Sequence, residues 1–403
     1  MNAAAAPFEA LLQVPRGEPV ALLHSGGRGA TWLCREPVAA LTRAAGNAAG
    51  AFAALDAFLQ EHRESRVVGW LGYDLGQDVE AWPRHIVDDF PVPVLHVAAY
   101  RRVQEFVPAI PSGAPPVPAA RQLRAHLSQG DYEARVAAVV EHICAGDIFQ
   151  ANLTQPFTAD WCGDPRSLFW RLCEQSPAPF AAYVEDGCGT AVLSSSPEEF
   201  LWRQGEHVRT RPIKGTRPRD ADPVRDAALL AELVASDKDQ AELAMIVDLL
   251  RNDLGKLAMV GSVQVGPFPE HATFAQVHHL FATVVARLRP AVRAVDLLRA
   301  TFPGGSITGC PKLRCLEILE QLEVARRGVY TGAIGWFGPG EQMHLNIAIR
   351  TLVHRDGRLR GNAGGGVTAL SDPHLEWRET LAKMAGIERA LQCSSSWPTG
   401  DNA

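Results

Sequence analysis

The sequence predicts an α+β protein in two lobes, and three observations lead to this class. Many short alternating apolar and polar stretches after residue 130 indicate strands, and amphipathic helical segments lie between them. No internal repeat of roughly 20 to 50 residues occurs, which argues against a solenoid or a propeller. Five prolines crowd residues 108–118, where neither a helix nor a central strand can form, so this stretch separates two lobes.

Residues 1–107 form the first predicted lobe, of mixed α/β character. An alanine- and leucine-rich amphipathic helix is expected over residues 47–63, followed by strands over residues 67–73 and 94–100. The proline-rich connection at residues 108–122 then runs over the surface to the larger lobe.

The second lobe, residues 130–391, is rich in predicted strands. Its first helix is expected over residues 131–144, with Asp131 as the N-terminal cap and Gly146 as the stop. Further helices are expected over residues 224–234 and 238–254 and from Asp372 onward, and strands over residues 147–157, 180–184, 190–195, 199–204, 207–211, 263–265, 278–288, 329–337, 344–353 and 358–361.

Composition and charge exclude several classes of function. A hydrophobic content of 47% is typical of soluble globular proteins, and a net charge of −6 gives no general attraction for nucleic acid or an acidic membrane surface. The eight cysteines include no Cys-x-x-Cys pair, so we expect reduced thiols. Neither a signal sequence nor a membrane-spanning apolar run is present, and we expect a cytoplasmic protein.

One stretch, Arg-Pro-Ile-Lys-Gly-Thr at residues 211–216, places Lys214 between a proline and a glycine. The hairpin expected at residues 199–211 should bring Glu198, in a Ser-Pro-Glu motif, close to this lysine, because a hairpin brings its outer ends together. A carboxylate beside an amine suits covalent attack with acid assistance to a leaving group. On local grounds alone, a solvated lysine at a strand end is the commoner role.

Four charged residues on two predicted helices are further candidates. Glu242 falls on the apolar stripe of its helix, where a buried carboxylate requires an ionic partner or a metal. The alternative places it at the edge of the stripe, bonded to a backbone amide. Glu376, Glu379 and Lys383 share one face of the last helix, where a surface ion pair between Glu379 and Lys383 is the simpler explanation.

Two histidines and one arginine lie in predicted strands. His278 and His279 are adjacent, so they point to opposite faces and at most one of them can enter a given site. A hydrogen-bonded core histidine is the commoner role for either one. Arg350 lies among aliphatic residues, and we expect it to meet a carboxylate bidentately.

Two glycine-rich stretches are candidate anion sites. Residues 302–312 lead into a helix at Pro311, and a glycine-rich loop before a helix N-terminus can bind an anion, although the spacing of a Walker loop is absent. Three consecutive glycines, Gly364 to Gly366, let backbone N–H groups converge on a carboxylate. A plain turn is the alternative for these glycines.

These motifs occur together and in order, and the combination resembles the chorismate-utilising enzymes. The motifs are Ser-Pro-Glu with Pro-Ile-Lys-Gly-Thr, Ala241-Glu242 followed by Ile-Val-Asp-Leu-Leu-Arg-Asn-Asp, Val277-His278-His279-Leu280, Phe-Pro-Gly-Gly-Ser-Ile-Thr-Gly, Ile349-Arg350, the triple glycine and Glu376-x-x-Glu379-x-x-x-Lys383. The resemblance covers about residues 130–390, and it extends more weakly to a shortened N-terminal lobe. It implies large, mostly antiparallel sheets packed in a sandwich, with helices on the outside.

The residue at position 214 selects a branch within this family. Lys214 resembles the aminodeoxychorismate synthases, whereas anthranilate synthases carry alanine there, and isochorismate and salicylate synthases place a lysine where this chain has Gln150. The resemblance therefore implies amination of chorismate to 4-amino-4-deoxychorismate for 4-aminobenzoate and folate synthesis. The alternatives are a first component of anthranilate synthase and a catalytically silent chorismate-binding subunit.

The resemblance also implies roles for single residues. Lys214 would be the nucleophile, Glu198 the acid that protonates the leaving hydroxyl, and His279 a group that polarises the ring substituents. The implied Mg²⁺ ligands are Glu242 and Glu379, with Glu376 close by, and the implied substrate-binding groups are Tyr330, Arg350, Lys383, Thr308, Gly364, Gly365 and Gly366. No Gly-x-Cys-x-Gly glutaminase motif is present, so we expect ammonia from a separate glutamine amidotransferase subunit in a heterodimer.

Overall fold

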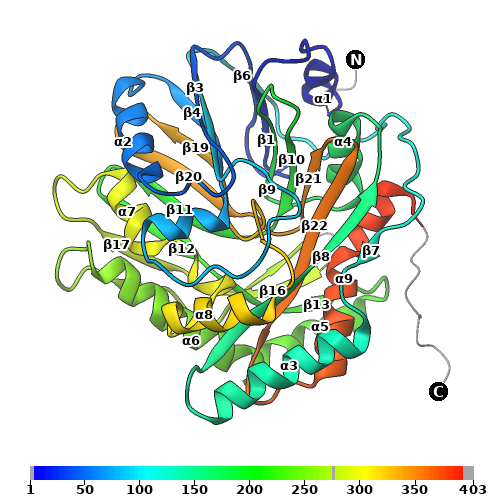
Figure 1. Cartoon of the computed structure of the whole chain (residues 1–403), viewed down its shortest axis with the longest axis vertical. Coiled ribbons are helices and arrows are strands. Elements are labelled where there is room, and N and C mark those ends of the chain that lie inside the picture. Colours follow the sequence, from blue (N-terminus) through cyan, green and yellow to red (C-terminus); the bar gives the residue numbers. More distant parts are fainter. Residues whose placement is uncertain (1–3, 275–276, 394–403) are drawn as a thin grey trace.

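The computed structural model describes residues 4–274 and 277–393, in which two large antiparallel sheets pack face to face between outer helices (Figure 1). This arrangement confirms the predicted α+β sandwich. Residues 1–3 of the expected first lobe lie outside the described residues. The helices are α1 (Ala6–Leu12), α2 (Ala51–Glu61), α3 (Gln129–Cys144), α4 (Pro165–Gln175), α5 (Pro223–Val234), α6 (Asp237–Gly255), α7 (Ala294–Thr301), α8 (Lys312–Leu322) and α9 (Pro373–Leu391), with the 3₁₀ turns η1 (Tyr73–Asp78) and η2 (Gly305–Ile307).

The first sheet has ten strands, and every neighbouring pair in it is antiparallel. In spatial order the strands are β18 (Gly309–Cys310), β8 (Gln150–Asp160), β22 (Arg358–Val367), β21 (Thr351–Arg355), β10 (Ala191–Ser196), β9 (Phe180–Glu185), β1 (Val20–His24), β2 (Thr31–Cys34) and β6 (Val103–Phe106), with β7 (Arg124–Ala125) paired to β8.

The second sheet has nine strands, and a small third sheet has three. The second sheet is ordered β14 (Gln264–Val265), β17 (Val284–Arg287), β12 (His207–Arg211), β11 (Glu199–Gln204), β20 (Gln342–Ile347), β19 (Ala333–Gly338), β4 (Arg66–Leu71), β5 (Leu95–Tyr100) and β3 (Ala39–Arg43). The third sheet is ordered β13 (Ile213–Pro218), β16 (Val277–Phe281) and β15 (Glu270–Thr273), and it carries the lysine stretch singled out above.

The central strands are apolar at consecutive positions because both of their faces are buried. In β4, Val68 and Trp70 face the core between the two large sheets, where they meet Val184 and Val192 of the other sheet. Their neighbours Val67 and Leu71 face the opposite core, which helices α2, α6 and α7 cover. Fully burying each such side chain contributes roughly 1.5–3 kcal/mol, so an apolar residue at every position stabilises two layers at once.

The N-terminal residues complete the two large sheets. Strands β1, β2 and β6 extend the first sheet beyond β9, and β3, β4 and β5 extend the second sheet beyond β19. The expected first lobe at residues 1–107 therefore shares both of its sheets with the expected catalytic region at residues 130–391. Residues 108–122 contain no regular helix or strand, as their prolines predict, and they cross between the two regions.

Several predicted element boundaries are wrong. Helix α3 is capped by Ser128, whose side chain accepts from the Asp131 amide, so the predicted cap lies inside the first turn. The strand expected over residues 278–288 is divided into β16 and β17, which belong to different sheets. The second error lies where the chain passes from one sheet to another, which local periodicity does not report.

Two further differences shape the candidate site. The strand expected over residues 344–353 is broken between β20 and β21, and Arg350 adopts a left-handed backbone with φ of 50° in this break. The break lets the chain leave the second sheet and enter the first. The three glycines after residue 363 continue β22 as an extended strand, in which Gly364, Gly365 and Gly366 pair with Thr154, Leu153 and Asn152 of β8.

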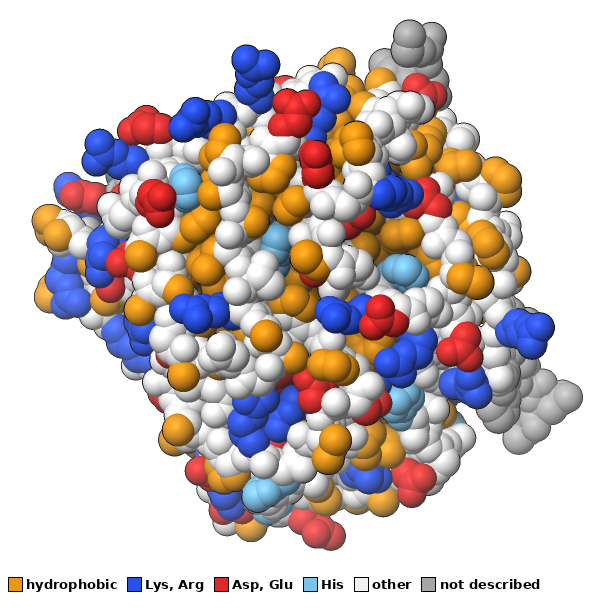
Figure 2. Space-filling model, turned by 45° about the horizontal axis from the view of Figure 1, so that its top comes forward, with side chains coloured by type: hydrophobic (Ala, Val, Ile, Leu, Met, Phe, Trp, Pro, Cys, Tyr) orange, Lys and Arg blue, Asp and Glu red, His pale blue; other side chains and the backbone are white. Residues whose placement is uncertain are grey.

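The surface is mixed in charge. On the face drawn in Figure 2, Lys and Arg side chains lie interspersed with Asp and Glu. This distribution agrees with the modest net charge of −6. No helix within residues 4–274 and 277–393 combines the length and the apolar character that a bilayer crossing requires.

Candidate active site

Lys214 is aimed by a β-bulge in the small third sheet. Lys214 pairs with Leu280 and Thr216 pairs with His279, so Gly215 is the additional residue on β13. Gly215 has a φ of +75°, and a Cβ atom there would lie 2.9 Å from Leu233 and 3.0 Å from Asp239. Glycine is therefore required both by the backbone and by the close approach of α5 and α6.

The amine of Lys214 lies against the glycine strand. A Cβ atom at Gly366 would lie 2.6 Å from Nζ of Lys214 and 2.5 Å from Nε2 of Gln150. Both polar side-chain atoms of Gln150 are buried and have no hydrogen-bond partner among the described residues. A buried amide without partners is costly, so the space beside Lys214 and Gln150 suits a polar ligand.

Glu198 is the buried acid of the site and follows β10. Its carboxylate accepts a 2.6 Å hydrogen bond from Ser306 Oγ, on the 3₁₀ turn η2, and its side chain lies close enough to Lys214 for their charges to interact. Burial raises the pKa of Glu198 to about 7, against the opposing effects of Ser306 and Lys214. At neutral pH this group can therefore both give and take a proton.

The two histidines divide as their alternation predicts. His278 is fully partnered, with Nδ1 2.9 Å from Thr273 Oγ1 and Nε2 2.9 Å from Asp226 Oδ1. His279 pairs only through Nδ1, 2.8 Å from Thr216 Oγ1, and its buried Nε2 has no partner among the described residues. Burial lowers the pKa of His279 to about 3, so the ring is neutral and presents Nε2 to a ligand.

Three carboxylates and two lysines form the charged end of the site. Glu379 lies 2.6 Å from Lys383 Nζ, and Glu242 lies 3.9 Å from Lys238 Nζ. The Lys383 charge lowers the pKa of Glu379, whereas burial raises the pKa of Glu242.

Glu376 differs from the other two carboxylates. Its Oε1 accepts a 2.7 Å hydrogen bond from Ser371, but its buried Oε2 has no partner within the described residues. Burial and the neighbouring charge of Glu379 both raise the pKa of Glu376. A Cβ atom at Gly365 would lie 2.6 Å from this free Oε2, so a glycine here leaves the carboxylate accessible.

The acidic residues fit Mg²⁺, an ion that proteins often hold with only one or two side-chain ligands. No group of three or more His, Cys, Asp or Glu residues in the described part of the chain is arranged as a complete metal site. Mg²⁺ is commonly bound by one or two carboxylates plus water and substrate oxygens, so a complete protein cage is not required. The unpartnered Oε2 of Glu376 and the oxygens of Glu242 and Glu379 are of the hard type that this ion takes.

Arg350 is a half-buried cation without an acidic partner in the described part of the chain. No carboxylate among residues 4–274 and 277–393 lies within ion-pair distance of its guanidinium, and burial lowers its pKa. The carboxylate that we expect Arg350 to meet would therefore belong to a ligand. A guanidinium in this position suits a bidentate anion.

The remaining predicted binding residues lie around these groups. Tyr330 is buried and lies close enough to Glu198 for their charges to interact, and Lys383 donates a 2.6 Å hydrogen bond to the Gly364 carbonyl. The Thr308 hydroxyl donates to the Gly304 carbonyl at 2.9 Å. The Thr308 oxygen therefore keeps only acceptor capacity for a ligand.

Two residues near these groups were not predicted. Ser306 lies within the glycine-rich loop motif, but the sequence gives no sign that its hydroxyl bonds Glu198. Lys238 precedes Glu242 by four residues on the same helix. This spacing predicts that the two side chains are neighbours, and it could have identified Lys238 from the sequence.

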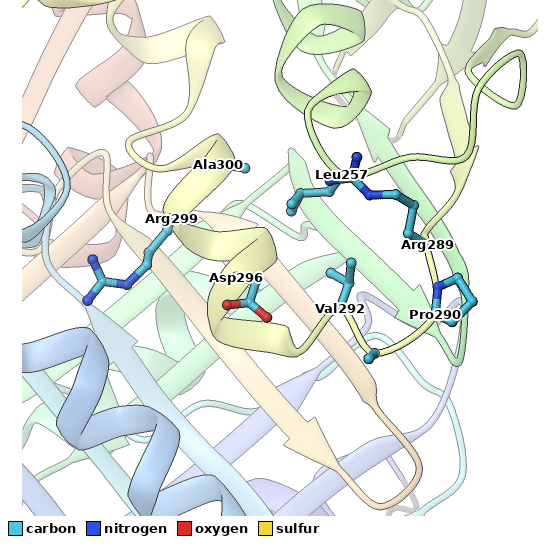
Figure 3. Close-up of a pocket in the computed structure, with 8 residues that line it drawn as sticks. Leu257, Arg289, Pro290, Val292, Asp296, Arg299 and Ala300 are labelled. Atoms are coloured by element: carbon cyan, nitrogen blue, oxygen red, sulfur yellow. The ribbon is translucent and has the colours of Figure 1, made fainter.

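A large surface groove lies elsewhere and includes none of these residues. It has a volume of about 550 Å³ and is lined by Leu257, Arg289, Pro290, Ala291, Val292, Asp296, Arg299 and Ala300 (Figure 3). Its two arginines bond backbone carbonyls of the protein, those of Lys256 and Asp78. The group around Lys214, which carries the unpartnered polar atoms of Gln150, His279 and Glu376, is therefore the better candidate site.

Comparison with known proteins identifies the family of the chain. The family model described as chorismate binding enzyme matches residues 18–389. Aminodeoxychorismate synthase component 1 from Klebsiella aerogenes is 41% identical over 348 residues, which cover 81% of this chain and 77% of the relative. Anthranilate synthase component 1 from Streptomyces coelicolor is also 41% identical, over 268 residues that cover 66% of this chain and 52% of the relative.

A solved structure shares the architecture. The crystal structure of anthranilate synthase component I from Streptococcus pneumoniae TIGR4 superposes with a TM-score of 0.76 at 26% identity, covering 89% of this chain and 92% of its own. Together with a family match over residues 18–389, this shows that the chain belongs to the chorismate-binding enzymes.

Proposed function

We propose that this chain catalyses the amination of chorismate to 4-amino-4-deoxychorismate, with ammonia as the nitrogen donor. Relatives named aminodeoxychorismate synthase support this function, at 41% identity over 348 residues and 49% over 253 residues, against 41% over 268 residues for a relative named anthranilate synthase. The observation that carries the choice is the position of Lys214, whose amine lies against Gly366 and within charge-interaction range of the buried acid Glu198.

Chorismate carries two carboxylates, and the site offers cations for them. Arg350 is half-buried and has no acidic partner in the described ranges, so a substrate carboxylate would supply the ion pair that its guanidinium lacks. Lys383 is already ion-paired with Glu379, so it would bind a substrate carboxylate while it keeps its contact with Glu379. His279 Nε2 and the Gln150 amide provide neutral polar contacts to the ring substituents.

Lys214 and Glu198 would carry the first chemical step. The neutral amine of Lys214 adds at C2 of the ring, the two ring double bonds shift, and the bond from C4 to its hydroxyl breaks. Glu198 donates the proton that lets this hydroxyl leave as water. Its pKa of about 7 suits an acid that must be protonated for this step and ionised afterwards.

Ammonia would complete the exchange in a second step. Its nitrogen adds at C4, the double bonds shift back, and the bond between C2 and Lys214 breaks to return the free amine. The Glu198 carboxylate can accept the proton that the new ammonium loses. The sum is chorismate plus ammonia giving 4-amino-4-deoxychorismate plus water.

Magnesium is proposed as the cofactor of this site. Glu242 and Glu379 would hold the ion, with Glu376 close by, and the bound ion would supply positive charge to the substrate oxygens. Lys238 and Lys383, which lie among these carboxylates, would balance part of the negative charge when no cation is present.

We also propose a separate glutamine amidotransferase subunit as the source of ammonia. The relative from Klebsiella aerogenes is named component 1, and the present sequence has no Gly-x-Cys-x-Gly glutaminase motif. The reaction would place the product in 4-aminobenzoate and folate synthesis, and we expect a cytoplasmic location.

The direct test is product analysis with the purified chain. We would incubate it with chorismate, Mg²⁺ and ammonium at mildly alkaline pH, which increases the free ammonia, and identify the product by mass and absorbance. Conversion to 4-amino-4-deoxychorismate without pyruvate release is expected. Anthranilate with pyruvate would indicate the alternative enzyme of the family, and binding of chorismate without turnover would indicate a silent subunit.

A lysine replacement tests the covalent step separately. Lys214→Ala should remove amination at C4 or divert the reaction toward anthranilate, while Lys256→Ala, which removes a half-exposed lysine paired with Asp253 outside the site, should leave the product unchanged. In the absence of ammonia, the native chain should gain the mass of chorismate less one water on the peptide containing Lys214. An unchanged product and rate in Lys214→Ala would refute this role.

A further inference from the structure

A buried ion pair lies behind the candidate site. Arg327 Nη2 lies 2.7 Å from Glu323 Oε1, and Arg327 Nε lies 2.9 Å from Glu323 Oε2. Their side chains are only 1% and 5% exposed. A buried pair of this kind adds little net stability over apolar residues, so its presence calls for another reason.

Arg327 also bonds three separate segments of the chain. Its Nη1 donates to the Ile307 carbonyl at 2.8 Å and to Thr331 Oγ1 at 3.2 Å, and its Nη2 donates to the Asn152 carbonyl at 2.6 Å. With the bonds to Glu323, these contacts use all of the guanidinium N–H groups. Glu323 in turn accepts from the amide and the hydroxyl of Thr154, at 3.0 and 2.8 Å.

One of these segments holds the proton donor. Ile307, whose carbonyl Arg327 binds, directly follows Ser306, and Ser306 donates to Glu198. The next residue, Thr308, offers its carbonyl to the Asn152 amide at 2.8 Å. The guanidinium therefore joins the loop that holds Glu198 to strand β8.

A second segment, strand β8 with Asn152, pairs with the strand against which the two lysine amines lie. Asn152 pairs across the ladder with Gly366, against which Lys214 Nζ lies. Thr154 pairs with Gly364, whose carbonyl accepts from Lys383. Any shift of β8 would thus be passed to the strand on which both amines rest.

We propose that Glu323 and Arg327 are positioning residues for the amination, because they fix the Ser306 loop against the β8–β22 ladder. They would thereby set the position of Glu198 relative to Lys214. This inference rests on the proposed function. Neither residue is among those that we expect to contact the substrate.

Replacement by lysine isolates the geometric role. Arg327→Lys keeps the charge beside Glu323, but an ammonium on a flexible stem cannot reproduce the planar fork that spans Ile307, Asn152 and Thr331. Misplacement of reacting groups by about 1 Å can cost on the order of 100-fold in rate. We therefore expect kcat to fall on the order of 100-fold, with a smaller change in KM for chorismate.

The adjacent arginine provides a matched control. Arg326 is also buried and ion-paired, 3.5 Å from Asp74 and 3.4 Å from Glu320, and both of these partners lie outside the Ser306 loop and β8. Arg326→Lys should lower stability to a comparable extent and leave kcat unchanged. Thermal unfolding of both variants separates loss of fold from loss of geometry.

The pH profile gives a readout that a purely structural role would not move. Lys214, Lys383, Tyr330 and the Ile213 amide face Glu198 besides Ser306, and they remain in the variant. Displacing Ser306 alone should move the alkaline limb of kcat to higher pH in Arg327→Lys. The double variant with Ser306→Ala should then show no additional shift.

The outcomes separate this inference from the proposed function. A native chain that forms no 4-amino-4-deoxychorismate overturns the function. A productive native chain with Arg327→Lys indistinguishable from Arg326→Lys, in kcat and in its pH limb, overturns only the positioning role. If Arg327→Lys does not fold, Glu323→Gln replaces it, because its single acceptor oxygen can still serve Thr154 while its NH2 group cannot accept from Arg327 Nε. A shift of the alkaline limb of kcat to higher pH in Glu323→Gln supports the inference, and an unchanged limb contradicts it.

Discussion

Ser306 donates a 2.6 Å hydrogen bond to Glu198, although the two residues are 108 positions apart in the chain. The bond joins the glycine-rich loop before α8 to the start of β11. Because it stabilises the ionised carboxylate, it opposes the effect of burial on the pKa of Glu198. The resulting balance near neutral pH leads to the first two predictions.

Ser306→Ala should move the alkaline limb of the pH–rate profile to higher pH. Glu198 must be protonated to assist the leaving hydroxyl, so activity falls as pH rises through its pKa of about 7. Loss of the Ser306 hydrogen bond raises this pKa further, because the bond stabilises the ionised carboxylate. Since free ammonia also rises with pH, the ratio of variant to native kcat at each pH is the quantity to measure. A ratio that does not change with pH would contradict the assignment of Glu198.

Glu198→Gln should stabilise the fold at alkaline pH while removing activity. The pKa of Glu198 is raised from 4.5 to about 7 in the folded chain, so native stability is lost as pH rises through 7. Glutamine has no such dependence. Its advantage in the free energy of unfolding should grow from pH 4.5 and level off above pH 7, reaching roughly 3 kcal/mol. Urea unfolding at several pH values tests this, and a constant difference would argue against a buried, titrating Glu198.

Gly366→Ala should reduce activity with little loss of stability. The new methyl group would displace Nζ of Lys214 and Nε2 of Gln150, both of which are ends of flexible side chains, and the strand backbone accepts alanine. We expect kcat to fall by on the order of 100-fold. Gly130→Ala, at a position with open space around it, is the control and should match the native chain. Equal activities would place Lys214 away from the reaction.

The paired histidines should separate stability from catalysis. His278→Gln should lower the free energy of unfolding, because it breaks a network with Thr273 and Asp226, and leave kcat largely intact. His279→Gln should lower kcat, since its Nε2 has no partner in the described part of the chain and the ring lies within charge-interaction range of Arg350 and Lys383. Because the pKa of His279 is about 3, this residue adds no limb to the profile near neutral pH. If His278→Gln lowered kcat and His279→Gln lowered only stability, the two roles would be exchanged.

Removal of divalent cations should abolish turnover, and Mg²⁺ should restore it. Glu379→Gln should weaken Mg²⁺ binding, measured by calorimetry in the presence of chorismate, because it removes a hard oxygen charge from the proposed ion site. Glu317→Gln is the matched control, since Glu317 pairs with Arg314 outside the site. Full activity in the presence of a chelator would contradict a magnesium-dependent reaction.

Much of the fold follows from local pattern. Hairpin β11–β12, helices α5 and α6 and the start of β4 lie close to where periodicity predicts them. The predictions failed at Arg350 and at the division of β16 from β17, where the chain passes from one sheet to another. Periodicity reports which face of a segment is buried, but the identity of the segment that covers it depends on contacts far apart in sequence.

The same limit applies to the site. Adjacency in an alternating strand was enough to predict that His278 and His279 differ in role, and hairpin geometry was enough to bring Glu198 near Lys214. No local pattern could show that Ser306 bonds Glu198 or that Arg327 reaches Asn152, 175 positions away. Both contacts join strands and loops whose order in space differs from their order in the chain.

The sequence by itself determined the branch of chemistry, because a lysine at position 214, an acid at position 198 and the spaced glutamates are chemical identities that no fold can supply. Tertiary structure alone decided which of these groups are buried, partnered or left free. A pKa, an unpartnered Nε2 on His279 and a carboxylate aimed past Gly365 all arise from what surrounds a side chain. Those surroundings come from strands that pair only when the two sheets are complete.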